Sequence, residues 1–109
     1  MAETIPLHSE LRSVHDFDSL LRSFVQSLPS KVAAIRTAME TDPGAAAALL
    51  HKLQGSAGGY GYPSISRAVS ELEKKVKSGV SAPELAGDVE GLEVLVERAL
   101  RGLDPAPNV

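Results

Sequence analysis

The chain contains no cysteine and no tryptophan, and it has few aromatic side chains of any kind. Without cysteine it forms no disulfide bond, offers no thiolate to a metal and has no cysteine nucleophile, which fits a reducing compartment. Two phenylalanines and two tyrosines among 109 residues leave a core that must be mainly aliphatic. Alanine and leucine dominate, and runs of β-branched residues are absent, so the composition favours helices over strands.

The chain also lacks an excess of positive charge, a long apolar run and the pattern of a secretory leader. Its formal net charge of −3 at pH 7 argues against a nucleic-acid partner, because that binding depends on Lys and Arg that neutralise phosphates. No apolar run approaches the roughly 20 residues of a membrane-spanning helix. Residues 1–6 lack a basic region followed by an apolar one. We therefore expect a cytoplasmic protein with no membrane insertion.

The first amphipathic segment runs from Phe17 to Met39 and passes through Pro29. Its apolar residues have the spacing of one helix face: Phe17, Leu20, Leu21, Phe24, Val25, Leu28, Val32, Ile35 and Met39. Proline removes one backbone donor and crowds the preceding turn. The segment is therefore either one long helix kinked near Leu28 or two helices that meet there, and the continuous stripe favours the first.

Turn residues divide the remainder of the chain into further helices. Asp42-Pro43 is typical of an N-cap with proline at the first helical position, which predicts a helix over residues 43–59. Pro63 begins the next helix and Gly79 stops it. The core stripe of that helix consists of Ile65, Ala68, Val69, Leu72 and Val76. Its other faces take Ser66, Arg67, Ser70, Glu73, Lys74 and Lys77.

The last helix follows a capping box over residues 81–84 and ends near Leu103. A short lid helix between Pro6 and Val14 is a further expectation. Four amphipathic helices with short connections predict an all-α fold, an antiparallel four-helix bundle. We expect one domain over residues 1–109, with the bundle at about 16–103 and short tails at both ends.

The helix over residues 43–59 places a histidine and two glycines on its outer side. On a helical wheel its core arc spans about 100° and contains Ala46, Leu49, Leu50, Leu53, Ala57 and Tyr60. His51 lies at about 200°, Gly58 at about 180° and Gly55 at about 240° on the same wheel. Close helix packing or a frayed helix end would account for the glycines, but not for their place beside His51. Because glycine inside a helix costs about 1 kcal/mol relative to alanine, we expect another molecule to approach His51 closely.

Residues 50–61, LHKLQGSAGGYG, resemble the phosphoacceptor motif of histidine phosphotransfer (HPt) domains, H-x-L-K-G-S-A-G-x-x-G. In that family the motif lies on the second long helix of a four-helix bundle, and a weaker resemblance extends over residues 17–78. The resemblance implies that His51 accepts a phosphoryl group on a ring nitrogen from a sensor histidine kinase or a receiver-domain aspartate. It would pass the group to a response-regulator aspartate. The neutral imidazole fits this role because it is a good nucleophile near pH 7.

The resemblance also assigns the surroundings of His51. Gly55 and Gly58 would keep the docking surface flat, and Ser56 holds a position where the family often has a small residue. The chain would be a monomeric phosphocarrier rather than an enzyme, since it has no nucleotide-binding motif. It would have no metal site and no cofactor of its own, and the partner receiver domain would bring the Mg²⁺ needed for transfer.

One position departs from the family pattern. Three residues after the histidine the family usually has Lys or Arg, but here it is Gln54, which can donate a hydrogen bond without bringing charge. Lys52, about 100° round the helix, and Arg67 on the next helix are the candidates for replacing that charge. We expect Gln54 to weaken stabilisation of the phosphoryl group without preventing transfer.

The rival interpretation is a helical adaptor that binds a receiver or another protein without phosphoryl transfer, and such an adaptor would not need His51. His8 and His15 have no glycine neighbours or metal-ligand spacing, so we interpret them as exposed polar residues. A basic run near the end of the third helix is explained by the helix dipole and by solvation; it consists of Lys74, Lys75 and Lys77.

Overall fold

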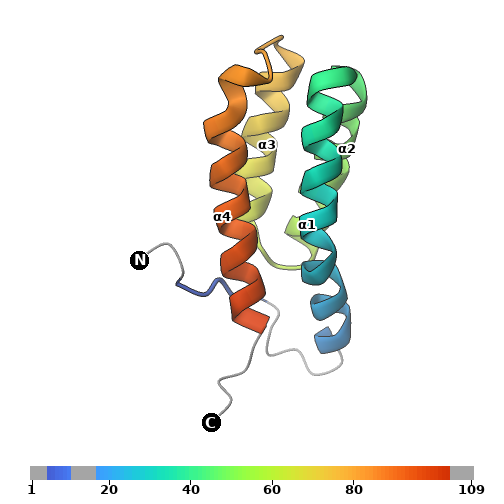
Figure 1. Cartoon of the computed structure of the whole chain (residues 1–109). Helices are drawn as coiled ribbons and strands as arrows, with labels where there is room; N and C mark the ends of the chain where they lie inside the picture. The colour runs from blue at the N-terminus through green and yellow to red at the C-terminus, as the bar shows by residue number, and fades with distance from the viewer. Residues whose placement is uncertain (1–4, 11–16, 104–109) are drawn as a thin grey trace.

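The computed structural model describes residues 5–10 and 17–103, which contain four α helices. The elements are α1 (Asp18–Thr41), α2 (Pro43–Gly59), α3 (Pro63–Lys77), the 3-10 turn η3 (Pro83–Leu85) and α4 (Ala86–Leu103). Short connections make consecutive helices antiparallel, and α1 and α3 each pack against both α2 and α4 (Figure 1). The all-α bundle predicted from the sequence is confirmed.

Helix α1 is continuous through Pro29, so the prediction of one long helix rather than two is confirmed. Pro29 is exposed, so its ring lies outside the core. The proline removes the helical hydrogen bond to the carbonyl of Val25, but the helix continues on both sides of it. The apolar stripe faces the core except at Leu20, which is 49% exposed. Leu20 therefore belongs to the surface, although its spacing fits the stripe.

Local capping residues set the limits of α2 and α3. The Oδ1 atom of Asp42 accepts a hydrogen bond of 3.2 Å from the N–H of Ala45, which confirms the predicted N-cap of α2. Gly61, in the turn after α2, has φ 84°, and Gly79, just beyond α3, has φ 91°. Side chains other than glycine rarely adopt this left-handed backbone conformation, so these two glycines fix where the chain turns.

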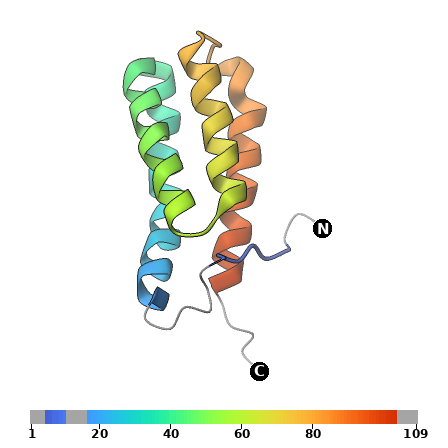
Figure 2. The same cartoon turned by 180° about the vertical axis from the view of Figure 1, so that it is seen from behind.

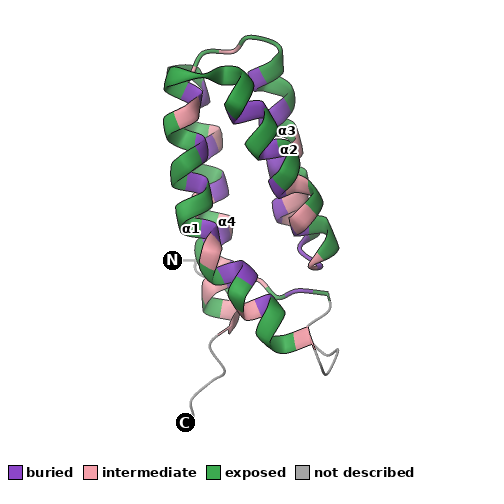
Figure 3. Cartoon of the chain, turned by 90° about the vertical axis from the view of Figure 1, so that its right-hand side faces the viewer, coloured by how far each residue is buried: buried purple, intermediate pink, exposed green. Residues whose placement is uncertain are grey.

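The core lies along the axis of the bundle, where the buried faces of all four helices meet (Figure 3). Its largest fully buried side chains are aliphatic: Leu28, Leu50, Ile65, Leu72, Leu85, Leu92, Val25 and Val69. The aromatic rings gather near the α2–α3 turn, where Phe24 stacks on Tyr60 with ring centroids 4.5 Å apart. None of the described helices has both the length and the apolar character needed to cross a membrane.

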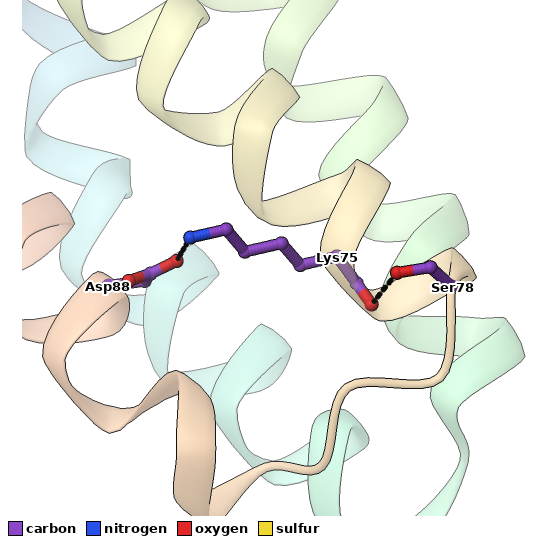
Figure 4. Close-up of polar contacts among 3 residues, drawn as sticks. All are labelled: Lys75, Ser78 and Asp88. Carbon is purple, nitrogen blue, oxygen red and sulfur yellow. Dashed lines mark hydrogen bonds and ion pairs between the residues drawn. The ribbon is translucent and has the colours of Figure 1, made fainter.

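A polar contact ties α3 to α4 beside the loop that joins them (Figure 4). The Nζ atom of Lys75 donates to Oδ2 of Asp88 at 2.7 Å, and this hydrogen bond raises the pKa of Lys75. The Oγ atom of Ser78 donates to the carbonyl oxygen of Lys75 at 3.0 Å. In the predicted capping box, the carboxylate of Glu84 accepts from the backbone N–H of Ser81 at 3.4 Å. These side chains hold the connection close to the ends of both helices.

The N-terminal segment differs from the sequence-based expectation. Residues 6–10 are not helical, whereas residues 11–14 of the predicted lid helix lie outside the described residues. The segment runs beside α4, because the N–H of Leu7 donates to the carbonyl of Arg98 at 2.8 Å (Figure 2). A Cβ atom at Gly102 would overlap the carbonyl oxygen of Leu7. Hydrogen bonds to distant residues thus replace the local bonds that a lid helix would have made.

Candidate functional site

His51 lies in the middle of α2 and faces away from the core. Its neighbours Leu50 and Leu53 are almost fully buried, so they fix the rotation of the helix and hold His51 on the outer side. The imidazole is 74% exposed, and its Nδ1 atom lies 3.2 Å from Oε2 of Glu73 on α3. The ring is therefore accessible to another molecule and held on one side by a carboxylate.

The Glu73 carboxylate is unusual because its side chain is only 8% exposed. Lys77, one turn further along α3, places its Nζ atom 2.9 Å from the same Oε2 atom. The hydrogen bond from Lys77 lowers the pKa of Glu73, burial opposes that shift, and His51 adds to the lowering. Paired in this way, Glu73 is ionised, which a buried carboxylate without a partner would not sustain.

An ionised carboxylate fixes which nitrogen of His51 carries the proton. Because a carboxylate only accepts hydrogen bonds, the contact with Glu73 favours the tautomer with hydrogen on Nδ1. The lone pair is then on Nε2, on the other side of the ring. The site thus presents one nucleophilic nitrogen, Nε2, to an approaching molecule.

The polar-face position predicted for Glu73 is wrong, because the structure buries this residue among the core residues of α3. A signal is present in the sequence, since Glu73 follows the buried Val69 by four residues and therefore lies at the edge of the core stripe. A charged residue at such an edge is ordinarily solvated, and the partner of Glu73 on α2 is not a sequence neighbour. The spacing alone therefore does not reveal that Glu73 belongs to the site.

Gly55 and Gly58 are exposed on the outer side of α2, near His51 in the chain. A Cβ atom built at Gly55 would meet nothing within 4 Å, so close packing of helices does not require glycine there. A Cβ atom at Gly58 would lie 3.5 Å from Oγ of Ser66, which is an ordinary contact. Nothing within the described part of the chain requires glycine rather than a larger residue at position 55.

The other predicted site residues fall on two flanks of α2. On one flank, Gln54 and Arg67 line an open hollow of about 440 Å³ between α2 and α3. On the other flank, Lys52 and Ser56 line a hollow of about 210 Å³ between α1 and α2. The structure thus brings Arg67 beside Gln54 and places Lys52 on the opposite side, so that the two candidate cations lie on different faces.

A hydrogen bond between α2 and α3 joins two of the residues that line the hollow with Arg67. The Oγ atom of Ser66 donates to the carbonyl oxygen of Gln54 at 3.0 Å. Lys74 also lines this hollow, and its Nζ atom lies 3.7 Å from the carboxylate of Glu71. Among the described residues, no group of three acidic or histidine side chains is placed to hold a metal ion.

The remaining histidines do not extend the site. His8 is exposed in the N-terminal segment, and His15 lies outside the described residues.

The structure is a four-helix bundle that presents a histidine near the middle of an exposed helix face. Residues 19–104 match the model of the Hpt domain family, and the chain belongs to that family. Hpt domains act in histidine phosphotransfer within two-component phosphorelays, as phosphocarriers rather than catalytic enzymes. Their partners are phosphorelay kinases and the receiver domains of response regulators. Comparisons with curated proteins and with solved structures found no match.

Proposed function

We propose that His51 is the phosphoacceptor, and that it carries the phosphoryl group on Nε2. It takes the group from a sensor histidine kinase or a receiver-domain aspartate and gives it to the aspartate of a response regulator. The observation that carries this assignment is the exposed imidazole whose Nδ1 faces a buried carboxylate, that of Glu73. The exchange takes place in the cytoplasm, with the chain acting as a monomer.

The chemistry is an in-line displacement at phosphorus. The lone pair of Nε2 forms the N–P bond while the P–O bond to the donor aspartate breaks, and the electron pair of that bond stays on the aspartate carboxylate. The ring of His51, which keeps its proton on Nδ1, becomes positively charged. The carboxylate of Glu73 stabilises this charge and holds the ring in position, as the buried carboxylate does in a Ser-His-Asp triad. Onward transfer reverses these steps with a second receiver.

The partner supplies the rest of the reaction. A receiver domain brings the aspartate and the Mg²⁺ that neutralises the phosphoryl oxygens, so this chain contributes a nucleophile on a rigid helix. Gly55 and Gly58 let the surface of that partner approach α2, and the open space above Gly55 supports this role. Ser56 contributes a small side chain at the edge of the same surface.

The positive charge missing at Gln54 is supplied in part from α3. Arg67 lines the same hollow as Gln54, and its long side chain can turn toward a phosphoryl group bound to His51. Lys52 lies on the other flank and is the less direct source. With the charge supplied from a neighbouring helix, transfer proceeds without a cation at position 54.

The test is transfer of labelled phosphate from a phosphorylated receiver domain or an active sensor kinase. We expect an acid-labile, base-stable label on the wild-type chain and on His8→Gln, which removes an exposed histidine outside the site. His51→Gln should carry no label. Label that persists in His51→Gln would overturn the assignment. Tight binding of receivers with no label on the wild type would favour the adaptor instead.

A further inference from the structure

Lys77 and His51 contact the same atom of Glu73. The Nζ atom of Lys77 lies 2.9 Å from Oε2 of Glu73, and Nδ1 of His51 lies 3.2 Å from that oxygen. Because they share this oxygen, the ammonium and Nδ1 are at most about 6 Å apart, a separation at which one charge still acts on another. The two neighbouring lysines of α3 have other partners: Lys74 pairs with Glu71, and Lys75 pairs with Asp88.

A lysine and a glutamate four residues apart on an exposed helix face ordinarily matter little. This pair differs because the Glu73 side chain is 8% exposed, whereas that of Lys77 is 62% exposed. The lysine thus brings a solvated charge to a carboxylate that water hardly reaches. That carboxylate also faces the ring that is to be phosphorylated.

The charge of Lys77 offsets the field that Glu73 exerts on the imidazole. A carboxylate beside a histidine stabilises the charged imidazolium, and an imidazolium has no lone pair with which to attack phosphorus. A nearby ammonium opposes that effect by repulsion.

We propose that Lys77 is a positioning residue for phosphoryl transfer, which acts through Glu73 to hold the His51 ring in the orientation for attack. This role rests on the proposed function of His51 as phosphoacceptor. Other charged groups surround α2 on its own surface and on the two helices packed against it, and these are Lys52, Lys31, Arg67, Glu71 and Lys74. In the described part of the chain, none of them forms an ion pair with His51 or Glu73.

The first test compares Lys77→Gln with Lys75→Gln, because Lys75 is an exposed lysine of α3 that pairs with Asp88 and does not contact Glu73. Lys77→Gln should lower the rate of phosphoryl uptake at saturating receiver about threefold, the effect of one charge about 6 Å away in water. The half-saturating receiver concentration should not change. Lys75→Gln should change neither quantity, and equal rates for the two variants would overturn the proposal.

A second comparison separates this role from contact with the partner. In the Glu73→Gln background Lys77 has lost its ion pair with the carboxylate, so Lys77→Gln should have little further effect on the rate of phosphoryl uptake. A pH-independent rise in the half-saturating receiver concentration, retained in the Glu73→Gln background, would contradict the proposal and assign Lys77 to docking.

A third measurement does not depend on transfer. Nitrogen-15 NMR of the free protein should show that less of the neutral His51 ring carries its proton on Nδ1 in Lys77→Gln, with no change in Lys75→Gln. No such difference would contradict the role of Lys77. If the two variants differ in this way but the wild type takes up no phosphate, Lys77 orients the ring of His51 and the phosphoacceptor assignment fails.

Discussion

Replacing Gly55 by alanine should make the protein more stable and lower its affinity for a receiver domain. Gly55 lies inside α2, and a Cβ atom there meets nothing within 4 Å, so the substitution adds no clash within the fold. Alanine is favoured over glycine in a helix interior by about 1 kcal/mol. The free energy of unfolding should therefore rise by about 1 kcal/mol, which raises the melting temperature by about 4 °C for a domain of this size.

The added methyl group would stand on the side of α2 where a receiver domain is expected to dock. Overfilling a well-packed contact costs about 1–3 kcal/mol, which is about 5- to 150-fold in partner affinity. The assay is the half-saturating receiver concentration for phosphoryl uptake, measured together with thermal unfolding followed by circular dichroism. Stability should rise while affinity for the receiver falls.

Gly91→Ala is the matched control, because Gly91 is an exposed glycine inside α4 with open space where its Cβ atom would lie. It should give the same gain in stability with no change in transfer. If Gly55→Ala transfers phosphate as well as Gly91→Ala does, the glycine at position 55 does not serve docking. A Gly55→Ala variant less stable than the wild type would contradict the claim that a Cβ atom at position 55 meets no neighbouring group.

Three further predictions concern other parts of the molecule. Because the pKa of Glu73 is lower in the folded protein than its unfolded value of about 4.5, its carboxylate stabilises the fold above pH 4.5. This contribution is lost as the pH falls through the lower folded pKa. The difference in unfolding free energy between wild type and Glu73→Gln, measured in urea, should therefore shrink below pH 4.5. Gly102→Ala should displace the N-terminal segment and cost about 1–2 kcal/mol, because its Cβ atom overlaps the carbonyl oxygen of Leu7; amide exchange at Leu7 as slow as in the wild type would contradict this. Gln54→Lys should lengthen the lifetime of the phosphorylated protein in buffer, and Arg67→Gln should shorten it; unchanged lifetimes in both would remove the need for a cation there.

The helix limits can be predicted because they depend on residues close together in the chain. Asp42 caps the helix that follows it, and Gly79 takes the left-handed conformation that ends the one before it. These effects operate within one turn of helix, so the sequence contains them fully. The N-terminal segment cannot be predicted in this way, because its backbone bonds go to residues such as Arg98, far along the chain.

The core stripe is predictable at its centre and less so at its edges. The spacing places Leu49 within the core arc of α2 and Leu20 within that of α1, but they are 38% and 49% exposed. Spacing gives the direction of a side chain within a helix. Whether an edge position is covered depends on how close the neighbouring helix lies, which spacing does not give.

Only the part of the candidate site that lies on α2 can be predicted from the sequence. His51 and its glycines are on one helix, so a helical wheel is enough to place them together on the outer side. Glu73 reaches the imidazole, and brings Lys77 near it, only because α3 packs antiparallel to α2. A contact of this kind between residues 22 positions apart needs the fold itself.

The central claim is that His51 accepts phosphate on Nε2 while its Nδ1 stays protonated against Glu73. The most direct measurement is NMR of the phosphorylated protein labelled with nitrogen-15 in histidine, which locates the nitrogen bonded to phosphorus. We expect phosphorus on Nε2 of His51 alone. Phosphorus on Nδ1 of His51, or on another residue, would contradict the claim.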